Sequence, residues 1–265
     1  MGKKFLVFLI ILIIGIVSVT GYIFFRPPAE EIIQDPMLRK IKTQGQILIG
    51  TDATYPPMES IDDKGNFIGM DIDIGQEIAK DFGVKAEFRN IIWDKIFDTL
   101  LNKEVDMLIS SITITPERAE RMAFSDPYFN AGQVIVTSLD KVNEIKGTQD
   151  LAGKKLGVQI ETTSQIEAQK YTDPDLVIPF ENYDLAKDEL LKGLIDAIII
   201  DYPAAAGMVS GQETFRIVGE PFTQEFYGIA VRKEEKVLLG EINETIRRLK
   251  RENIIEEMGK KWLAE

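Results

Sequence analysis

Residues 100–111 read LLNKEVDMLISS and residues 190–201 read LLKGLIDAIIID, which is one layout repeated at an offset of 90 residues. Each segment has the end of a helix, a tight turn, an aspartate and then a buried apolar strand. The repeat places Ser111 and Asp201 at equivalent positions, the carboxyl ends of two strands. Ligands of open α/β sheets bind beyond such ends. Chance similarity is the competing interpretation, because helix-turn-strand units with common residues resemble one another.

The repeat is part of a longer alternation of strands and helices. Apolar runs predict strands at residues 47–51, 106–111, 155–160 and 196–201. Helical periodicity predicts helices at residues 74–81, 93–103, 163–170 and 184–192, and a pair of helices within residues 234–263. This order is typical of an α/β protein with mainly parallel sheets. The 265 residues, 45% of them hydrophobic, suffice for one large domain or for two lobes with separate cores.

The composition limits the chemistry that the chain can perform. It contains no Cys and no His, which excludes disulfides, thiolate nucleophiles, imidazole proton transfer and His ligands for a metal. Catalysis would depend on carboxylates, Lys or Tyr. Asp71 and Asp73 in the segment DIDIG suggest calcium, but Gly75 occupies the position of the next oxygen ligand and no glutamate closes the loop at its twelfth position. No metal and no other cofactor is predicted.

The charge of the chain is strongly negative. Three of the 31 basic residues and none of the 43 acidic residues precede Glu30, so the rest of the chain has a net charge of about −15. Such a field repels nucleic acid and anionic lipid headgroups. The sequence also has no basic block and no RNA-binding aromatic signature. Nucleic-acid binding is therefore not expected.

The N-terminus predicts a membrane segment. Residues 5–25 are an uncharged apolar run, long enough to cross the ~30 Å hydrocarbon core as a helix. Two lysines before the run favour a cytoplasmic N-terminus. A cleavable signal with a site at residues 19–21 is the alternative, although its apolar core would be unusually long. Both interpretations export the remainder of the chain, and we expect a transmembrane signal anchor over residues 1–26 and a linker over residues 27–45.

Six segments in order along residues 47–263 resemble the extracytoplasmic amino-acid-binding proteins of solute-binding protein family 3, which serve ABC importers. The segments are IGTDATYPPMES (49–60), GNFIGMDIDIGQEIA (65–79), SSITITPERAERMAFSDPYF (110–129), GKKLGVQIETT (153–163), DAIIIDYPAA (196–205) and YGIAVRK (227–233).

The resemblance implies a two-lobed periplasmic-binding-protein fold of type II. Two crossover strands would lie near residues 130–134 and 221–228. Lobe one would comprise residues 46–130 and 228–265, and lobe two residues 131–227 with the hinge strands. The resemblance also implies a monomer that delivers an amino acid to the membrane subunits of an ABC transporter.

Arg118 is the first candidate ligand-binding residue. It follows Thr115 and Pro116, which have the character of an N-cap and a first helical residue, so backbone N–H groups and the guanidinium can face one anion. The planar fork of Arg suits a carboxylate. The resemblance implies that Arg118 binds the α-carboxylate of the ligand. A surface ion pair with Glu117 or Glu120 is the competing interpretation.

Hydroxyl groups follow two of the predicted strands. Ser110, Ser111 and Thr113 can bond the α-carboxylate or the α-ammonium, and the resemblance implies that they do. Ser and Thr at strand ends are also ordinary turn formers. Thr162 and Thr163 open a predicted helix of lobe two, where the resemblance implies a second contact with the α-carboxylate.

Asp201 follows four apolar residues, where an unpaired carboxylate is costly. We therefore expect it to meet a cation, and the resemblance implies the α-ammonium of the ligand. Capping of a helix that begins near Tyr202 is an alternative role, and the two roles are compatible.

The side chain of the ligand is expected to meet aromatic and acidic groups. Tyr55 and Trp93 correspond to the aromatic walls of the family, although an isolated Tyr or Trp is more often a core residue. Asp52 and Asp71 correspond to positions that set the polarity around the ligand side chain. With Asp201, these residues predict a polar or basic amino acid: arginine, lysine, histidine or glutamine.

Two residues depart from the family pattern. Met58 stands where an aromatic residue is usual, an exchange that a core position tolerates. Glu161 stands where relatives carry glycine, and its side chain could contact a cationic ligand, point outward or narrow the pocket.

Two other functions compete with binding and delivery. Glu161 or Asp201 could serve as the acid of a dehydratase-like enzyme on a similar fold. The sequence offers no second proton-transfer group, so we expect binding without catalysis. A sensing module for a separate membrane partner is the third class of function.

Overall fold

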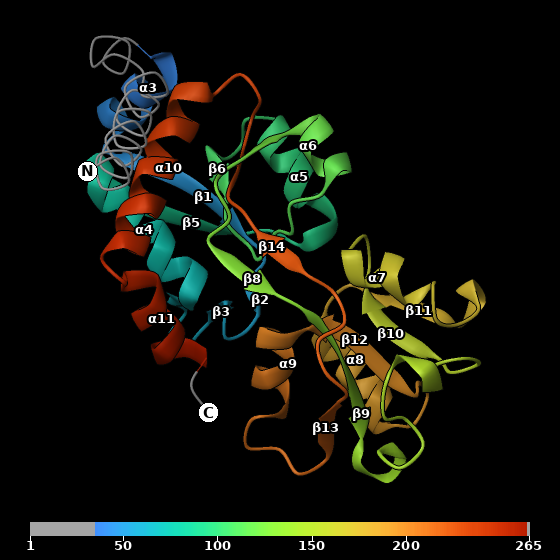
Figure 1. Ribbon diagram of the computed structural model, residues 1–265. Coiled ribbons are helices and arrows are strands. Elements are labelled where there is room, and N and C mark those ends of the chain that lie inside the picture. The colour runs from blue at the N-terminus through green and yellow to red at the C-terminus, as the bar shows by residue number, and fades with distance from the viewer. Residues whose placement is uncertain (1–34, 264–265) are drawn as a thin grey trace, which may run out of the picture.

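The computed structural model describes residues 35–263. The predicted membrane segment, residues 5–25, lies outside this range, and no helix between residues 35 and 263 is long and apolar enough to cross a membrane. The described chain forms two α/β lobes (Figure 1). They are joined by an antiparallel pair of strands, β8 (Phe129–Ala131) and β14 (Glu225–Tyr227).

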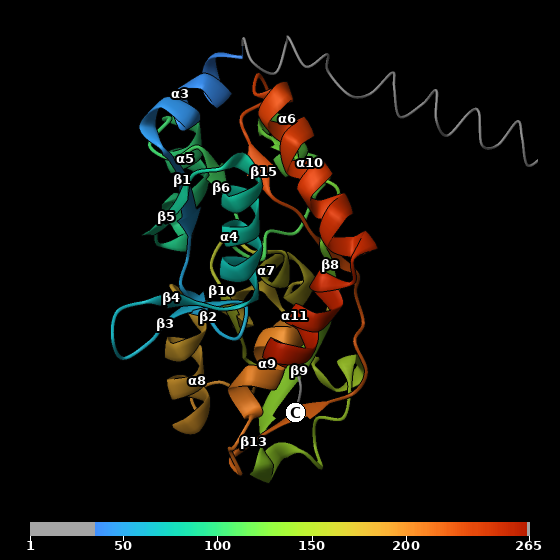
Figure 2. The ribbon, with the colours of Figure 1, turned by 90° about the vertical axis from the view of Figure 1, so that its left-hand side faces the viewer.

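Lobe one contains a five-stranded sheet in the order β5-β1-β6-β15-β7. Its strands are β1 (Gln46–Thr51), β5 (Lys85–Asn90), β6 (Met107–Leu108), β7 (Ala123–Phe124) and β15 (Ala230–Val231). Its helices are α3 (Pro36–Gln44), α4 (Met70–Phe82), α5 (Trp93–Leu101), α6 (Pro116–Arg121), α10 (Lys236–Arg251) and α11 (Ile254–Leu263). A small antiparallel sheet of β2 (Thr54–Tyr55), β3 (Glu59–Ile61) and β4 (Phe67–Ile68) extends from this lobe toward lobe two (Figure 2).

Lobe two contains a second five-stranded sheet in the order β11-β10-β12-β9-β13. Its strands are β9 (Gln133–Ser138), β10 (Leu156–Gln159), β11 (Val177–Phe180), β12 (Ala197–Asp201) and β13 (Phe215–Val218). Its helices are α7 (Thr163–Ala168), α8 (Tyr183–Leu191) and α9 (Tyr202–Val209), with short 3-10 turns at Leu139–Lys141, Thr148–Asp150 and Pro174–Leu176. Helix α11 of lobe one reaches α9 of lobe two (Figure 2).

In each five-stranded sheet four strands point the same way, as expected for mainly parallel sheets, and one strand runs against them. In lobe one β1 pairs in parallel with β5 and β6, whereas β15 pairs antiparallel with β6 and β7. Lobe two repeats this mixture, because β9 runs antiparallel to β12 and β13. The antiparallel strands β9 and β15 lie next to the crossover strands. Strand β9 directly follows the crossover strand β8, and β15 directly follows β14, so each runs away from the hinge into its lobe. This direction explains why each is antiparallel to its neighbours in the sheet.

The repeated segments form matching structures in the two lobes. Lys103 and Gly193 both have left-handed backbone conformations, with φ of 65° and 69°. The carboxylate of Asp106 accepts from Leu48 N at 2.9 Å and from the Lys40 ammonium. The carboxylate of Asp196 accepts from Lys155 N at 2.8 Å and from the Lys141 ammonium. Each aspartate thus ties its own strand to the start of the neighbouring one, which explains why both segments carry it.

The cores explain the strand patterns. In β1, Ile47 and Ile49 pack against α3, α4 and α10, whereas Leu48 faces α5 on the other side of the sheet. Strand β12 is buried along its whole length because α8 and α9 cover one face and α7 covers the other. An uninterrupted apolar run such as that of β12 is the expected signature of a strand covered on both faces.

The linker expected over residues 27–45 is too long, because residues 36–44 belong to lobe one. Asp35 caps α3 by accepting from Met37 N and Leu38 N at 3.0 and 2.9 Å. Leu38 and Ile41, three residues apart, are buried in the core of lobe one. The helix is therefore held by both its cap and its apolar face.

Asp35→Ala is expected to lower the free energy of unfolding by about 1 kcal/mol, because two backbone N–H groups lose their acceptor. Urea unfolding followed by circular dichroism measures the change. Asp63→Ala, at an exposed loop position, is the matched control and should leave the urea midpoint unchanged. Equal midpoints for the two variants would show that the Asp35 cap contributes nothing to the stability of lobe one.

Candidate functional site

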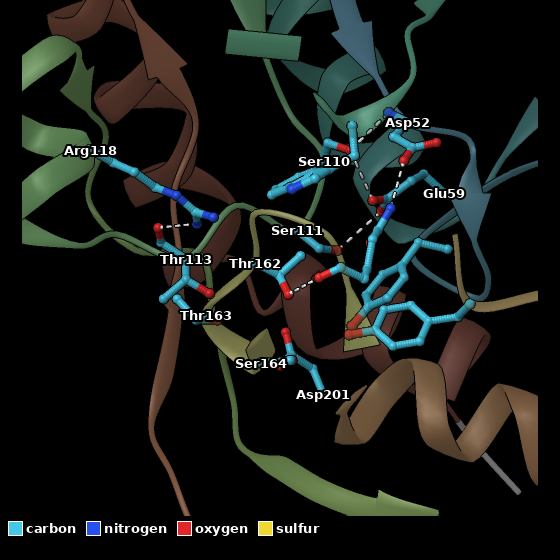
Figure 3. A pocket seen from close by; sticks show the side chains of 14 residues that line it. Asp52, Glu59, Ser110, Ser111, Thr113, Arg118, Thr162, Thr163, Ser164 and Asp201 are labelled. Atoms are coloured by element: carbon cyan, nitrogen blue, oxygen red, sulfur yellow. Dashed lines mark hydrogen bonds between the residues drawn. The ribbon is translucent and has the colours of Figure 1, made fainter. Parts of the chain in front are cut away.

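A pocket with about 390 Å³ of empty space lies between the lobes. It brings together ten of the eleven predicted ligand-binding residues, from both lobes (Figure 3). The predicted residues that line it are Asp52, Tyr55, Trp93, Ser110, Ser111, Thr113, Arg118, Thr162, Thr163 and Asp201. The sequence did not point to four further lining residues, Glu59, Gln159, Ser164 and Tyr183.

Arg118 is held on one side of the pocket by its own helix and by aromatic rings. Thr115 caps α6 by accepting from Arg118 N at 3.2 Å, so that N–H is not available to a ligand. The guanidinium donates to the Thr113 carbonyl at 2.9 Å and lies over the Trp93 ring, 5.3 Å from its centroid. Burial lowers the pKa of Arg118 to about 10, so the side chain stays protonated at neutral pH. The donor that Arg118 offers to an anion is therefore its guanidinium, which stacking orients.

Asp201 presents an acceptor without a partner. Its Oδ2 accepts from the Tyr227 hydroxyl, whereas its buried Oδ1 has no hydrogen-bond partner among the described residues. The carboxylate occupies the N-cap position of α9 but makes no capping bond, so capping does not explain its burial. Burial raises the pKa of Asp201 to about 7, and Arg118 opposes this shift. An ammonium group placed in the pocket would pair with Oδ1 and favour the ionised form.

The hydroxyls after β6 are already engaged within lobe one. Ser110 Oγ accepts from Asp52 N at 2.8 Å and donates to one carboxylate oxygen of Glu59, and Ser111 Oγ donates to the other oxygen, both at 3.1 Å. Ser111 has φ of 48°, a left-handed conformation that is uncommon outside glycine. The end of this strand thus orients the Glu59 carboxylate.

Thr162 and Thr163 begin α7 and use their hydroxyls inside the protein. Thr162 Oγ1 donates to the Gln159 carbonyl at 2.7 Å and accepts from Gln165 N at 3.3 Å. Thr163 Oγ1 donates to Glu225 of the hinge strand β14 at 3.1 Å. The first backbone N–H groups of this helix are the donors that remain for a ligand.

Aromatic side chains from both lobes form the walls of the pocket. Tyr55 lies on β2 of lobe one and Tyr183 on α8 of lobe two, with ring centroids 5.6 Å apart. Trp93, at the start of α5, donates from Nε1 to the Glu161 carbonyl of lobe two at 3.3 Å. These contacts cross between the lobes, and a further one joins Gln159 Nε2 to Asp52 at 3.1 Å.

The structure corrects the expectation for one acidic residue and decides between the alternatives for another. Asp71 does not line the pocket: its fully buried carboxylate accepts from Ser111 N at 2.7 Å and from the Tyr128 hydroxyl at 2.8 Å, beneath the strand end. Glu161 is exposed and does not line the pocket either, so of its three possible orientations it adopts the outward one. Its φ of 57° is left-handed, a conformation that glycine adopts more readily than other residues.

Of the pocket residues that the sequence analysis did not identify, one could have been recognised from its position in the sequence and another could not. Gln159 ends β10, at the same kind of strand end as Ser111 and Asp201, and this position could have identified it. Glu59 stands in the polar stretch ESIDDKG, which resembles an exposed turn. It is nevertheless only 1% exposed, because β3 folds over the end of β6.

Two lobes joined by paired strands, with a guanidinium and a carboxylate that has one unpartnered oxygen facing one pocket, are the features of a solute-binding protein of the periplasmic type. The chain belongs to the bacterial extracellular solute-binding proteins, family 3, whose family model matches residues 47–265.

Several known members are similar to this chain over most of its length. The L-cystine-binding protein TcyJ of Escherichia coli K12 is 30% identical over 229 residues, 86% of each chain. The crystal structure of the P235GK mutant of ArgBP from T. maritima is 40% identical, has a TM-score of 0.81 and covers 86% of this chain and 100% of its own. An ancestral arginine-binding protein, solved bound to arginine and bound to glutamine, is 39% identical with TM-scores of 0.78 and 0.77, and covers 83% of this chain and 99% of its own.

Proposed function

We propose that the protein is the extracytoplasmic substrate-binding component of an amino-acid ABC importer. The observation that carries the proposal is the pairing of opposite charges across one pocket, Arg118 on one side and the unpartnered Oδ1 of Asp201 on the other. An α-amino acid carries a carboxylate and an ammonium on one carbon atom, and a single ligand can satisfy both groups. The family membership and the amino-acid-binding relatives support this role.

The ligand is a polar or basic amino acid in this proposal. Figure 3 shows Asp52 and Glu59 on the opposite side of the pocket from Arg118. With the Gln159 amide and the rings of Tyr55 and Tyr183, they form an acidic and aromatic region for the ligand side chain. A guanidinium or an amide matches these acceptors, and a guanidinium also gains from the aromatic faces. Arginine and glutamine, bound by the ancestral relative, are the leading candidates, with lysine and histidine next.

Ligand binding and closure are coupled in this mechanism. Arg118 belongs to lobe one and Asp201 to lobe two, so the ligand bridges them. Direct contacts of Trp93 and Asp52 with lobe two act alongside the ligand. The strands β8 and β14 form the hinge, and Glu225 on β14 bonds Thr163 at the pocket. The bridged form then displays the surface that the membrane subunits recognise.

Binding without turnover fits the site better than catalysis. Of the two acids that a dehydratase-like reaction could use, Glu161 lies outside the pocket. Asp201 lines the pocket, but its role in this proposal is to pair with the α-ammonium. The relatives named above are binding proteins.

A thermal-shift screen of the purified full chain against the twenty amino acids tests the function. A ligand at 100 times its dissociation constant adds about 2.7 kcal/mol of stability, which should raise the melting temperature by roughly 5 to 10 °C. We expect the largest shift with arginine or glutamine. Agmatine, which is arginine without its carboxylate, is the matched control and should give no shift. The absence of a shift with all twenty amino acids would contradict the proposed function.

A further inference from the structure

Two buried carboxyl groups, those of Glu59 and Asp71, are in contact below the side-chain region of the pocket. They are 1% and 0% exposed, and Ser111 bonds both of them, donating from Oγ to Glu59 at 3.1 Å and from its backbone N to Asp71 at 2.7 Å. The two carboxyl groups are also close enough to hydrogen-bond each other. Glu59 also lines the pocket, whereas Asp71 lies behind it. The pair therefore joins the pocket surface to the interior of lobe one.

The hydrogen bonds around the pair leave a place for one proton. Both oxygens of Glu59 accept from serine hydroxyls, and Oδ2 of Asp71 accepts from Ser111 N and Tyr128. Oδ1 of Asp71 is buried and has no other partner among residues 35–263. Two carboxylates in contact can form a hydrogen bond only if one of them carries a proton. A single proton held by either group lets that carboxyl donate to the other.

The surroundings favour the protonated pair. Burial raises the pKa of Glu59 well above its usual value, the charges of Asp71 and Asp52 raise it further, and the hydroxyls of Ser110 and Ser111 oppose the shift. Burial likewise raises the pKa of Asp71, against the donors Ser111 N and Tyr128. Each group that faces the pair is neutral or acidic. Coupled carboxyl groups of this kind lose their protons in two separate steps.

We propose that the Glu59–Asp71 pair releases its proton when the ligand side chain is cationic and keeps it when the ligand side chain is neutral. A guanidinium or ammonium beside Glu59 supplies the positive charge that the second carboxylate needs. An amide leaves the pair protonated, and the carboxyl group remains a hydrogen-bonding partner. One pocket can then accept both arginine and glutamine. This inference rests on the proposed function and adds proton exchange to it.

Calorimetric titration of the full chain with L-arginine and with L-glutamine tests the exchange. Each titration is run at one near-neutral pH in two buffers of different ionisation enthalpy, and the difference in heat counts the protons released. Asp201 also ionises when it meets an α-ammonium, but it does so for both ligands. We therefore expect arginine to release about one proton more than glutamine. The affinity for arginine should accordingly rise more steeply with pH, because a low pH opposes proton release.

Substitutions test whether the extra proton released on arginine binding comes from the Glu59–Asp71 pair. In Glu59→Gln, the extra proton released by arginine should disappear, whereas it would persist if Asp52 were its source. Asp71→Asn removes the repulsion within the pair and should reduce the release, which provides a second test if Glu59→Gln does not fold. Glu241→Gln, on α10 outside the pocket lining, is the matched control and should behave as the parent protein.

The outcomes separate this inference from the proposed function. If arginine binds with the same proton count as glutamine, the proton exchange is overturned and the binding function stands. If glutamine does not bind, the number of protons released on arginine binding is compared between the parent protein and Glu59→Gln. An equal number in the two proteins would overturn the proton exchange. Failure of arginine to bind would overturn the exchange, and failure of all amino acids would overturn the function as well.

Discussion

Arg118→Ala is expected to weaken amino-acid binding by at least about 30-fold, and by up to several thousand-fold. Loss of one partner of a desolvated charge pair costs about 2 to 5 kcal/mol, because the ligand carboxylate would remain buried without its cation. The side chain also lies over the Trp93 and Phe97 rings, so its removal loosens the wall of the pocket. Calorimetric titration with the best ligand of the thermal-shift screen measures the loss.

Two variants serve as controls for Arg118→Ala. Arg118→Lys keeps the charge but loses the planar fork and the stacking, and should show a smaller loss. Arg121→Ala lies on the same helix, where its guanidinium pairs with exposed Asp98, and should leave the affinity unchanged. An unchanged affinity in Arg118→Ala with a native circular dichroism spectrum would remove Arg118 from the binding site.

Asp201→Asn is expected to have an effect of the same size, again about 2 to 5 kcal/mol, because the α-ammonium would lose its counter-charge inside the pocket. The amide is nearly isosteric, so the core around β12 should remain intact. Glutamine is the suitable ligand for this comparison, because its side chain carries no charge.

The pH dependence of glutamine binding gives an independent test of Asp201. Since burial raises the pKa of Asp201 to about 7, the free protein holds a proton that the α-ammonium must displace. Affinity should therefore increase as the pH rises toward about 7 and level off above it, by up to about tenfold per unit below that point. Asp201→Asn should lack this dependence. Tyr227→Phe removes a donor to Asp201 and should move the profile to a higher pH. A flat profile in the parent protein would contradict the assigned role of Asp201.

The candidate site could be predicted largely from local features of the chain. Thr115 and Pro116 identify the start of α6 and hence the placement of Arg118, since capping depends on residues that are close in sequence. The strand ends that carry Ser111 and Asp201 are visible in the repeated segments. Because parallel strands of neighbouring lobes present their carboxyl ends to a common cleft, residues 90 positions apart could be expected to meet.

Residues 27–45 show where local evidence is insufficient. Prolines and charges in this stretch are typical of a linker. Because helix α3 begins with its cap at Asp35, however, the predicted linker must end before that residue. The helix is held because Leu38 and Ile41 meet the core formed with α10, about 200 residues later in the chain. Two apolar residues in a short segment do not indicate that the segment will pack against a helix so far along the sequence.

By itself the sequence determined the α/β class, the family and the strand ends, and it predicted contacts with the α-amino and α-carboxyl groups of a ligand, because each depends on short motifs or on their order. Only the tertiary structure decided which acidic side chains line the pocket, which are buried behind it and which are exposed. Glu59 became a pocket residue, Asp71 went beneath Ser111, and Glu161 turned outward. The charge of a buried carboxyl depends on desolvation and on neighbours 40 to 52 residues away. Such contacts exist only once the segments have folded against one another.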